Sequence, residues 1–330
     1  MNKEITYSEN ILEGFKYLLD NDEDVFVLGQ GLWSPWYVGN SMKDLDKIYG
    51  RQRIIDTPVS ENAITGAAIG ASLCGSKPIV VHPRMDFMLY AMDPIINQAA
   101  KWSYMFGGQS SPSITIRGII NRGGEQGAQH SQALHSLFAH IPGLKVVLPS
   151  SVADARDLLI ASVLADQPVI YIDDRWLYDQ EDTLPEAKEI NLESINPCIL
   201  REGDSITLVG CSYSTFLLKK VTKKLIQNKI NPEIIDMRII NPFHSELITN
   251  SVKKTGRLFV LDGGWGPCGI SSEIISSAVE NVEPKLFKSK PARLTLPFTP
   301  APTSKVLEKE YYPTEKKILN KIFKIFENNL

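Results

Sequence analysis

The chain has 330 residues, of which 43% are hydrophobic and 22% are charged, and its formal net charge at pH 7 is -3. This balance is typical of a globular protein, and it argues against a disordered chain and against a protein that coats a polyanion. We therefore expect no nucleic-acid partner. Since one hydrophobic core usually serves about 100–200 residues, the length predicts two domains.

Cysteine usage and the N-terminal residues indicate a cellular compartment. The chain has 4 cysteines, which lie far apart without CxxC or Cys/His spacing. They predict neither a disulfide framework nor a structural zinc site, and a reducing cytoplasm suits them. Residues 1–15 have no apolar stretch and are too acidic for a transit peptide, and no segment approaches the ~20 apolar residues of a membrane span. We expect a cytoplasmic protein without membrane contact.

The first part of the chain alternates strand and helix patterns. Apolar runs predict strands over 25–29, 53–55, 78–81, 113–117, 144–148 and 168–172, and helical spacing predicts helices over 7–20, 61–73, 85–101 and 152–165. Strands that are apolar throughout and alternate with helices indicate a parallel sheet covered on both faces. An α/β domain is therefore expected.

A second α/β domain follows an acidic connection. Residues 179–197 contain proline and lack periodicity, so we place a boundary near residue 190 and predict domains over 1–185 and 186–330. The second domain is predicted to contain strands over 205–209, 232–236, 257–261 and 293–296, with helices over 215–228, 245–253 and 270–279.

The segment Asp56-Thr57-Pro58-Val59-Ser60-Glu61-Asn62-Ala63 leads from a strand through a proline-bearing loop into a helix rich in Gly and Ala. A structural interpretation is available, because a carboxylate favours a helix N-terminus and Ser60 is a candidate N-cap. The small side chains also permit close backbone approach, which would draw Glu61 into an interior or an interface. A carboxylate kept partly protonated there suits acid-base catalysis, so both interpretations stay open on these residues alone.

A second candidate site lies in the Gly-rich polar loop 123–132 (GGEQGAQHSQ), which follows a predicted strand. An isolated histidine is usually a hydrogen-bonded structural residue, but loops of this kind commonly carry functional groups. His130 is therefore a candidate catalytic residue. His135 and His140 are interpreted as structural.

Residues 264–269 (GWGPCG) match the glycine pattern GxGxxG between a predicted strand and a predicted helix. This is the context of a dinucleotide-binding loop, so an NAD-binding protein is an alternative of another class. Pro267 within the turn and the position near the chain's end argue against it. Binding of NADH would distinguish the two classes.

Several motifs, in order and at matching spacing, resemble the beta subunit of the pyruvate and branched-chain 2-oxo-acid dehydrogenase E1 family. In the first domain they are 7–11 (YSENI), 26–29 (FVLG), 53–61 (RIIDTPVSE), 93–101 (DPIINQAAK), 127–132 (GAQHSQ) and 142–147 (PGLKVV). In the second they are 201–204 (REGD), 235–238 (IDMR), 252–258 (VKKTGRL) and 262–265 (DGGW). The resemblance covers almost the whole chain.

The resemblance implies a thiamine-diphosphate-binding domain of the transketolase pyrimidine type, followed by a domain like the transketolase C-terminal domain. It implies that Glu61 hydrogen-bonds the N1' atom of the cofactor's aminopyrimidine, and that His130 lies at the mouth of the substrate channel. The cofactor carries the organic chemistry, and the protein orients it. Phe87, Met85 and Gln30 are expected near the cofactor.

Some residues depart from the family pattern. Met85 and His82 stand where Phe would be usual, Gln30 replaces a usual Glu, and Arg84 is unusual. In a pocket Arg84 would favour an anionic or phosphorylated substrate, although an exposed or salt-bridged arginine is the equally simple alternative. We expect His82, Arg84 and Gln129 to line the substrate pocket. The segment 163–168 is one residue shorter than in members that bind potassium, so the sequence leaves open whether a structural potassium ion is bound.

The family's metal-binding motif for Mg2+ is absent here and belongs to its alpha subunit, so we expect the partner to hold the magnesium ion. The resemblance implies an alpha2beta2 assembly, oxidative decarboxylation of a small 2-oxo acid and acyl transfer to a lipoyl carrier of an E2 acyltransferase. Residues 300–308 (PAPTSKVLE) are closer to split transketolases, so a two-carbon or acyloin transfer is the alternative. A non-catalytic scaffolding subunit would not explain Glu61 and His130 together.

Overall fold

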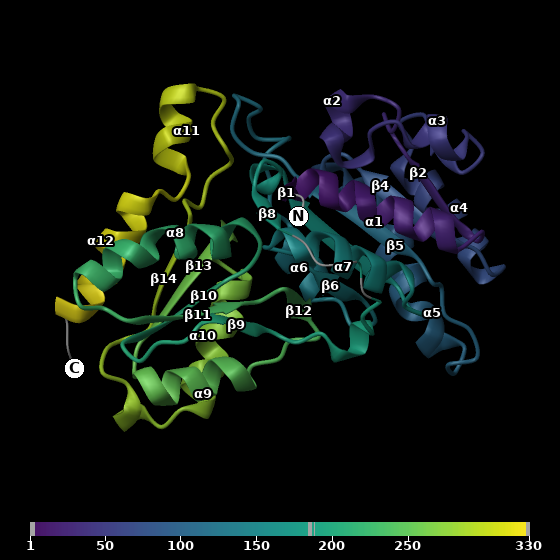
Figure 1. Cartoon of the computed structure of the whole chain (residues 1–330). Helices are drawn as coiled ribbons and strands as arrows, with labels where there is room; N and C mark the ends of the chain where they lie inside the picture. The colour runs from purple at the N-terminus through teal and green to yellow at the C-terminus, as the bar shows by residue number, and fades with distance from the viewer. Residues whose placement is uncertain (1–3, 184–186, 188, 328–330) are drawn as a thin grey trace. The chain divides into compact units, whose positions relative to one another are not determined.

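The computed structural model describes residues 4–183, 187 and 189–327, and the chain divides into two compact units. Unit 1 comprises residues 1–122 and 137–195, and unit 2 comprises residues 123–136 and 196–330. Both are α/β units with mainly parallel sheets, which confirms the predicted fold class (Figure 1). The sequence places the boundary at 185/186, whereas the structure divides the chain after Ile195 and assigns residues 123–136 to unit 2.

Unit 1 is built on a parallel sheet in which its strands follow the order β6-β7-β5-β4-β2-β3. The strands of unit 1 are β1 (Glu4–Thr6), β2 (Val25–Gly29), β3 (Ile54–Asp56), β4 (Lys77–His82), β5 (Thr115–Ile120), β6 (Lys145–Val147), β7 (Val169–Asp174) and β8 (Glu181–Thr183). Every residue of β5 and β7 is buried. Since successive side chains point to opposite faces, both faces of the sheet are covered, as predicted.

Three of the four helices predicted for unit 1 are present, the fourth is divided, and three short helices were not predicted. The helices of unit 1 are α1 (Tyr7–Asn21), α2 (Pro35–Val38), α3 (Leu45–Tyr49), α4 (Glu61–Leu73), α5 (Ala100–Met105) and α7 (Val152–Val163), with short 3-10 turns at 39–42, 175–177 and 192–194. The helix α6 (His135–Ala139) spans the division between the two units, since its first two residues are assigned to unit 2. The single helix predicted over 85–101 is instead a 3-10 helix (Met85–Ala91), a π-helix (Pro94–Ala99) and α5. Pro94 explains the break, because proline cannot continue a regular helix.

Unit 2 contains a sheet with strand order β14-β13-β10-β11-β9, in which β9 alone runs antiparallel. Its elements are β9 (Cys198–Arg201), β10 (Ile206–Gly210), α8 (Tyr213–Gln227), β11 (Pro232–Asp236), β12 (Ile239–Asn241), α9 (Glu246–Thr255), β13 (Leu258–Trp265), α10 (Ile270–Asn281), a 3-10 turn (Pro284–Leu286), β14 (Ala292–Leu296), α11 (Lys305–Tyr311) and α12 (Glu315–Glu327). In Figure 1, α8 and α12 lie on one side of this sheet and α9 and α10 on the other.

The core of unit 2 shows how strand alternation sorts side chains between the two faces. Ile206 and Leu208 of β10 belong to a buried apolar cluster with Ile318 and Ile322 of α12. Thr207 lies between them in sequence, and its hydroxyl instead hydrogen-bonds Ser251 Oγ of α9 at 2.6 Å. Because successive side chains of a strand alternate between its two faces, one face of β10 packs against α12 and the other contacts α9.

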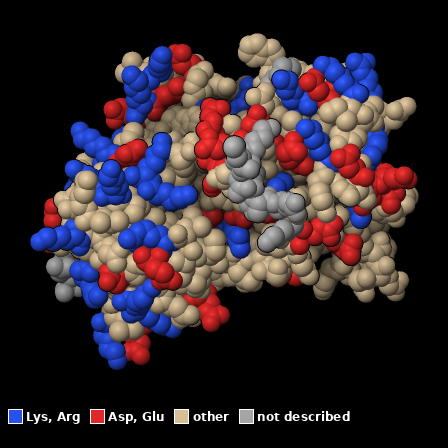
Figure 2. Space-filling view, viewed as in Figure 1, with Lys and Arg blue, Asp and Glu red and all other residues tan. Residues whose placement is uncertain are grey.

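The described residues contain no helix that is both long enough and apolar enough to cross a bilayer. Acidic and basic side chains lie close together across the visible face (Figure 2), as the small net charge leads one to expect. This mixture of charges does not contradict the expectation of a protein without a polyanionic partner.

A fully buried ion pair joins the central strands of unit 1. The Arg117 guanidinium on β5 donates to both Asp173 carboxylate oxygens on β7, at 2.8 and 2.9 Å, and also to Ser41 Oγ at 2.9 Å. Burial alone would lower the pKa of Arg117, but the neighbouring charge of Asp173 raises it above its usual value. The Arg117 guanidinium therefore stays charged inside the sheet.

We expect Asp173→Asn to lower the free energy of unfolding by about 3–5 kcal/mol, because it leaves the buried Arg117 charge without its counter-charge. Urea unfolding at pH 7 measures this change. Asp179→Asn is the matched control, since Asp179 is exposed and should change stability by less than about 0.5 kcal/mol. A change in Asp173→Asn as small as that of the control would contradict the role given to the pair.

Candidate functional site

The candidate site of unit 1 lies where parallel strands end. In the sheet register Gly29 of β2 pairs with Asp56 of β3 and with Val81 of β4, so these three strands terminate side by side. Gln30 follows β2, the loop to Glu61 follows β3, and His82 is the last residue of β4. The carboxyl edge of an open α/β sheet is where ligands bind. The structure therefore brings these predicted site residues to one edge.

Glu61 is the first residue of α4 and is only 6% exposed. Ser60 makes no side-chain capping hydrogen bond, so the structural N-cap interpretation is not supported. Among the residues that the structure describes, the Glu61 carboxylate has no hydrogen-bonding or ionic partner. A buried carboxylate without a partner is costly. Its position at the helix N-terminus offsets part of this cost, and a bound donor would offset more.

The loop after β4 separates the predicted pocket residues into buried and accessible ones. Met85 is fully buried, and it lies so close to β5 that a Cβ atom added at Gly118 would be 3.1 Å from Met85 Cβ. Phe87 and Arg84 are half-buried. Met85 therefore packs against the sheet, and Phe87 is the cofactor-binding candidate of this loop that remains partly accessible.

His82 is 2% exposed, and its Nε2 atom has no hydrogen-bond partner. Burial lowers the pKa of His82 to about 4 because the charged imidazolium loses hydration. The side chain is therefore neutral at pH 7. It lies within the core at the end of β4 and is poorly placed to carry a charge in a pocket.

The loop that carries His130 belongs to unit 2. His130 is half-buried and Gln129 is exposed. The loop is held by hydrogen bonds from Glu125 N to Glu308 Oε1 at 3.0 Å and from Gly123 N to Tyr312 Oη at 3.4 Å. Because the structure divides the chain into two units, Glu61 belongs to one unit and His130 to the other.

The end of this loop is fixed by a buried histidine, as the structural interpretation of His135 predicts. His135 Nε2 lies 3.1 Å from Asp262 Oδ1, and both residues are buried. Burial alone would raise the pKa of Asp262, but the hydrogen bonds from His135, Gly264 N and Ser271 N hold it below its usual value. Asp262 thus joins the loop to the start of α10.

Hydrogen bonds at the start of α10 test whether residues 264–269 form a dinucleotide-binding loop. Ser271 N donates to Asp262 Oδ2 at 3.2 Å, and Ile270 N donates to Ser136 Oγ at 3.0 Å. A pyrophosphate bound at this helix would need free backbone amides at its N-terminus. These two amides of α10 are already engaged, which argues against a dinucleotide site here.

A basic group that the sequence patterns did not single out lies at the same edge of unit 1. Arg175 follows β7 directly and donates to Asn121 Oδ1 at 3.2 Å, and Asn121 Nδ2 donates to Pro83 O at 2.8 Å. The charged run Asp173-Asp174-Arg175, which follows the apolar residues 168–172, is a signal that could have indicated Arg175.

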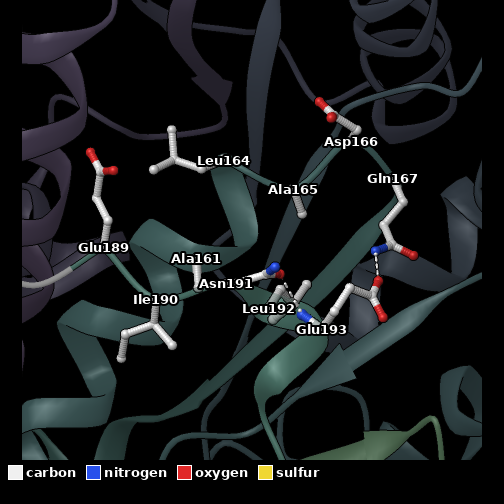
Figure 3. Close-up of a pocket in the computed structure, with 10 residues that line it drawn as sticks. All are labelled: Ala161, Leu164, Ala165, Asp166, Gln167, Glu189, Ile190, Asn191, Leu192 and Glu193. Carbon is white, nitrogen blue, oxygen red and sulfur yellow. Dashed lines mark hydrogen bonds between the residues drawn. The ribbon is translucent and has the colours of Figure 1, made fainter.

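A separate cavity of about 600 Å³ lies elsewhere in unit 1 (Figure 3). Its lining residues are Ala161, Leu164, Ala165, Asp166, Gln167, Glu189, Ile190, Asn191, Leu192 and Glu193. Glu193 accepts hydrogen bonds from Gln167 Nε2 at 2.5 Å and from Lys145 Nζ at 2.9 Å. Within the described ranges no cluster of three His, Cys, Asp or Glu residues could hold a metal ion. None of the predicted site residues lines this cavity.

Comparisons with known proteins cover both units. Residues 3–180 match the transketolase pyrimidine-binding domain, and residues 198–318 match the transketolase C-terminal domain. The acetoin:2,6-dichlorophenolindophenol oxidoreductase subunit beta of Bacillus subtilis is 34% identical over 333 residues, covering 97% of this chain and 96% of that protein. The pyruvate dehydrogenase E1 component subunit beta of Rickettsia bellii is 35% identical, covering 98% of each.

Two more comparisons agree with these. The mitochondrial pyruvate dehydrogenase E1 component subunit beta of Bos taurus is 33% identical, covering 96% of this chain and 89% of that protein. A solved structure, "Split gene transketolase, inactive beta4 tetramer", has a TM-score of 0.76 over 99% of each chain at 18% identity. That likeness shows the fold alone.

We expect protonation of His82 to lower the free energy of unfolding of the protein. The folded pKa of His82, about 4, lies below the ordinary value of 6.5, so the unfolded chain binds more protons between these values. The part of the free energy of unfolding that depends on neutral His82 is present above pH 6.5 and is lost as the pH falls toward 4. We expect wild type to lose about 2 kcal/mol more than His82→Phe between pH 7 and 5, measured by urea unfolding. Equal losses in the two proteins would show that His82 does not titrate this way.

Proposed function

This chain belongs to the family of E1 beta subunits of 2-oxo-acid dehydrogenases, with transketolase-type pyrimidine-binding and C-terminal domains, and we propose that it decarboxylates a small 2-oxo acid together with an alpha-type subunit. The family depends on thiamine diphosphate. When bound, this cofactor supplies the stabilisation of the carbanion that decarboxylation requires. In the proposed reaction the acyl group passes to a lipoyl carrier of an E2 acyltransferase.

The observation that carries the proposal is the buried carboxylate of Glu61. It is 6% exposed and without a partner in the described chain, at the sheet edge where ligands bind. We propose that Glu61 shares a proton with the N1' atom of the aminopyrimidine. Phe87, half-buried on the neighbouring loop, and Gln30 would help to hold that ring. Met85 would contribute to cofactor binding only indirectly, because it packs in the core against the sheet.

His130 is proposed to assist transfer of the acyl group. It is half-buried in a loop whose backbone is fixed by Glu308 and Tyr312. An imidazole can donate or accept a proton in such a step. Gln129 is exposed beside it and would contact the substrate.

The alpha-type partner is proposed to hold Mg2+ and the diphosphate, in an alpha2beta2 assembly located in the cytoplasm. The outer face of α4 supports the contact, since Asn62, Ala63, Gly66, Ala67 and Gly70 are exposed on it. At Gly66 and Gly70 a Cβ atom would meet nothing within 4 Å. Such a smooth helix face allows another backbone to approach closely, next to Glu61.

Glu61→Gln tests the role of the carboxylate, because an amide cannot exchange a proton with N1'. In the complex reconstituted with the alpha-type subunit, Mg2+ and thiamine diphosphate, we expect turnover of the 2-oxo acid substrate to fall by about 10²–10⁴-fold while assembly is retained. Dye reduction and gel filtration measure the two properties. Glu246→Gln is the matched control, since Glu246 is an exposed residue that likewise begins a helix. Near-normal turnover of Glu61→Gln would refute the proposal.

His130→Ala tests acyl transfer separately from decarboxylation. We expect lipoyl-dependent turnover to fall by at least about tenfold more than turnover with an artificial electron acceptor, since only the former needs the transfer step. His140→Ala is the control, because His140 is an exposed histidine that should leave both rates unchanged. Equal losses in the two assays for His130→Ala would argue against a transfer role.

A further inference from the structure

Three arginines follow three neighbouring strands at the carboxyl edge of the unit 1 sheet. Arg84 follows β4, Arg122 follows β5 and Arg175 follows β7. The register pairs His82 with Gly118 and Ile120 with Asp174, so the strands end side by side. These arginines therefore lie on the edge where an open α/β sheet binds its ligands.

Hydrogen bonds hold Arg175 beside the loop of Arg84. Arg175 donates to Asn121 Oδ1 at 3.2 Å and to the carbonyl oxygen of Trp36 at 3.4 Å, and Asn121 donates to the carbonyl oxygen of Pro83 at 2.8 Å. Gly39 makes room for the guanidinium, since a Cβ there would lie 3.2 Å from Arg175 Nη2. Asn121 thus bridges Arg175 to the residue that precedes Arg84.

The charges of these arginines are compensated to different degrees. Arg122 forms a buried ion pair with Asp174. Arg175 bonds only neutral oxygens, and no carboxylate in the described part of the chain forms an ion pair with it. Burial lowers the pKa of Arg84, the charge of Arg175 lowers it further, and Asp86 and Tyr37 act in the opposite direction. Two guanidinium groups therefore repel each other at the site edge, and an anion between them would relieve that repulsion.

We propose that Arg84 and Arg175 bind a second anionic group of the substrate, a carboxylate or a phosphoryl group at the end of the 2-oxo acid remote from the reacting carbonyl. The planar fork of a guanidinium matches both groups through paired, charge-assisted hydrogen bonds. The inference rests on the proposed function for the identity of the reaction. The proposed substrate differs from pyruvate, which the names of several relatives mention, because pyruvate has no second anionic group.

Binding of inorganic phosphate tests the site without any turnover. Calorimetric titration of the full chain should show phosphate binding that weakens by about tenfold or more in Arg84→Gln and in Arg175→Gln, with partial retention in Arg84→Lys. Arg51→Gln is the control, since Arg51 is an exposed arginine of the same unit, and it should bind like wild type. Equal phosphate affinity in all five proteins would overturn the proposal.

Turnover by the reconstituted complex identifies the anion. The matched substrates are 2-oxopentanoate, 2-oxoglutarate and 2-oxo-4-phosphonobutyrate, which differ only in a terminal methyl, carboxylate or phosphonate. We expect kcat/KM for one of the two anionic substrates to exceed that for 2-oxopentanoate by at least about tenfold, and Arg84→Gln to abolish the preference mainly through KM. A carboxylate preference and a phosphonate preference support the two chemical forms of the proposal, respectively.

Two outcomes would separate this inference from related failures. If the variants weakened thiamine diphosphate binding to the complex and left the substrate preference intact, the arginines would serve the cofactor and the proposal would be wrong. If no 2-oxo acid were turned over, the proposed function would fail, and the phosphate titration alone would decide whether the anion site exists. Thermal melting of each variant verifies that it is folded.

Discussion

The buried ion pair of Arg117 and Asp173 fixes the part of unit 1 on which the candidate site depends. It crosses from β5 to β7, and Tyr178 Oη also donates to Asp173 at 2.7 Å. The Arg117 guanidinium lies 5.5 Å from the ring centroid of Phe15 on α1. A charge pair inside a sheet contributes little net stability, but it tolerates few alternative arrangements of its surroundings. The strand ends that follow it therefore keep a defined register.

Register at those ends decides which side chains meet. Ile119 pairs with Asp173 and Ile120 with Asp174, so the residues just beyond, Asn121 and Arg175, can share a hydrogen bond. A slip of one residue would turn alternate side chains to the opposite face of the sheet. The strand register therefore determines which side chains lie together at the carboxyl edge of the sheet, where Glu61 and the arginines are located.

Much of the architecture was predictable because it follows from local pattern. The helix predicted over 61–73 agrees with α4 at both ends, and the apolar runs of unit 1 are its buried strands. The prediction failed over 85–101, where Pro94 interrupts an otherwise helical pattern. It also omitted α12, although Ile318, Ile322 and Ile325 recur at helical spacing and are buried.

The candidate site was predictable in composition more than in arrangement. Glu61 could be named because its type and its place at a helix start limit what it can do, whereas the role of Arg175 depends on a hydrogen bond to Asn121, 54 positions earlier. Likewise, His82 is a polar residue by type, yet the structure buries it in a neutral form. Long-range pairing and desolvation are properties of the folded chain, and no local pattern encodes them.

The loop 123–136 has a consequence for how the protein is made. Its residues belong with unit 2, and His135 finds its partner Asp262 only 127 positions further along the chain. During synthesis the N-terminal domain leaves the ribosome first, and this segment must wait until Asp262 has been translated. This loop can therefore acquire its final, anchored conformation only after the C-terminal residues that hold it have been translated.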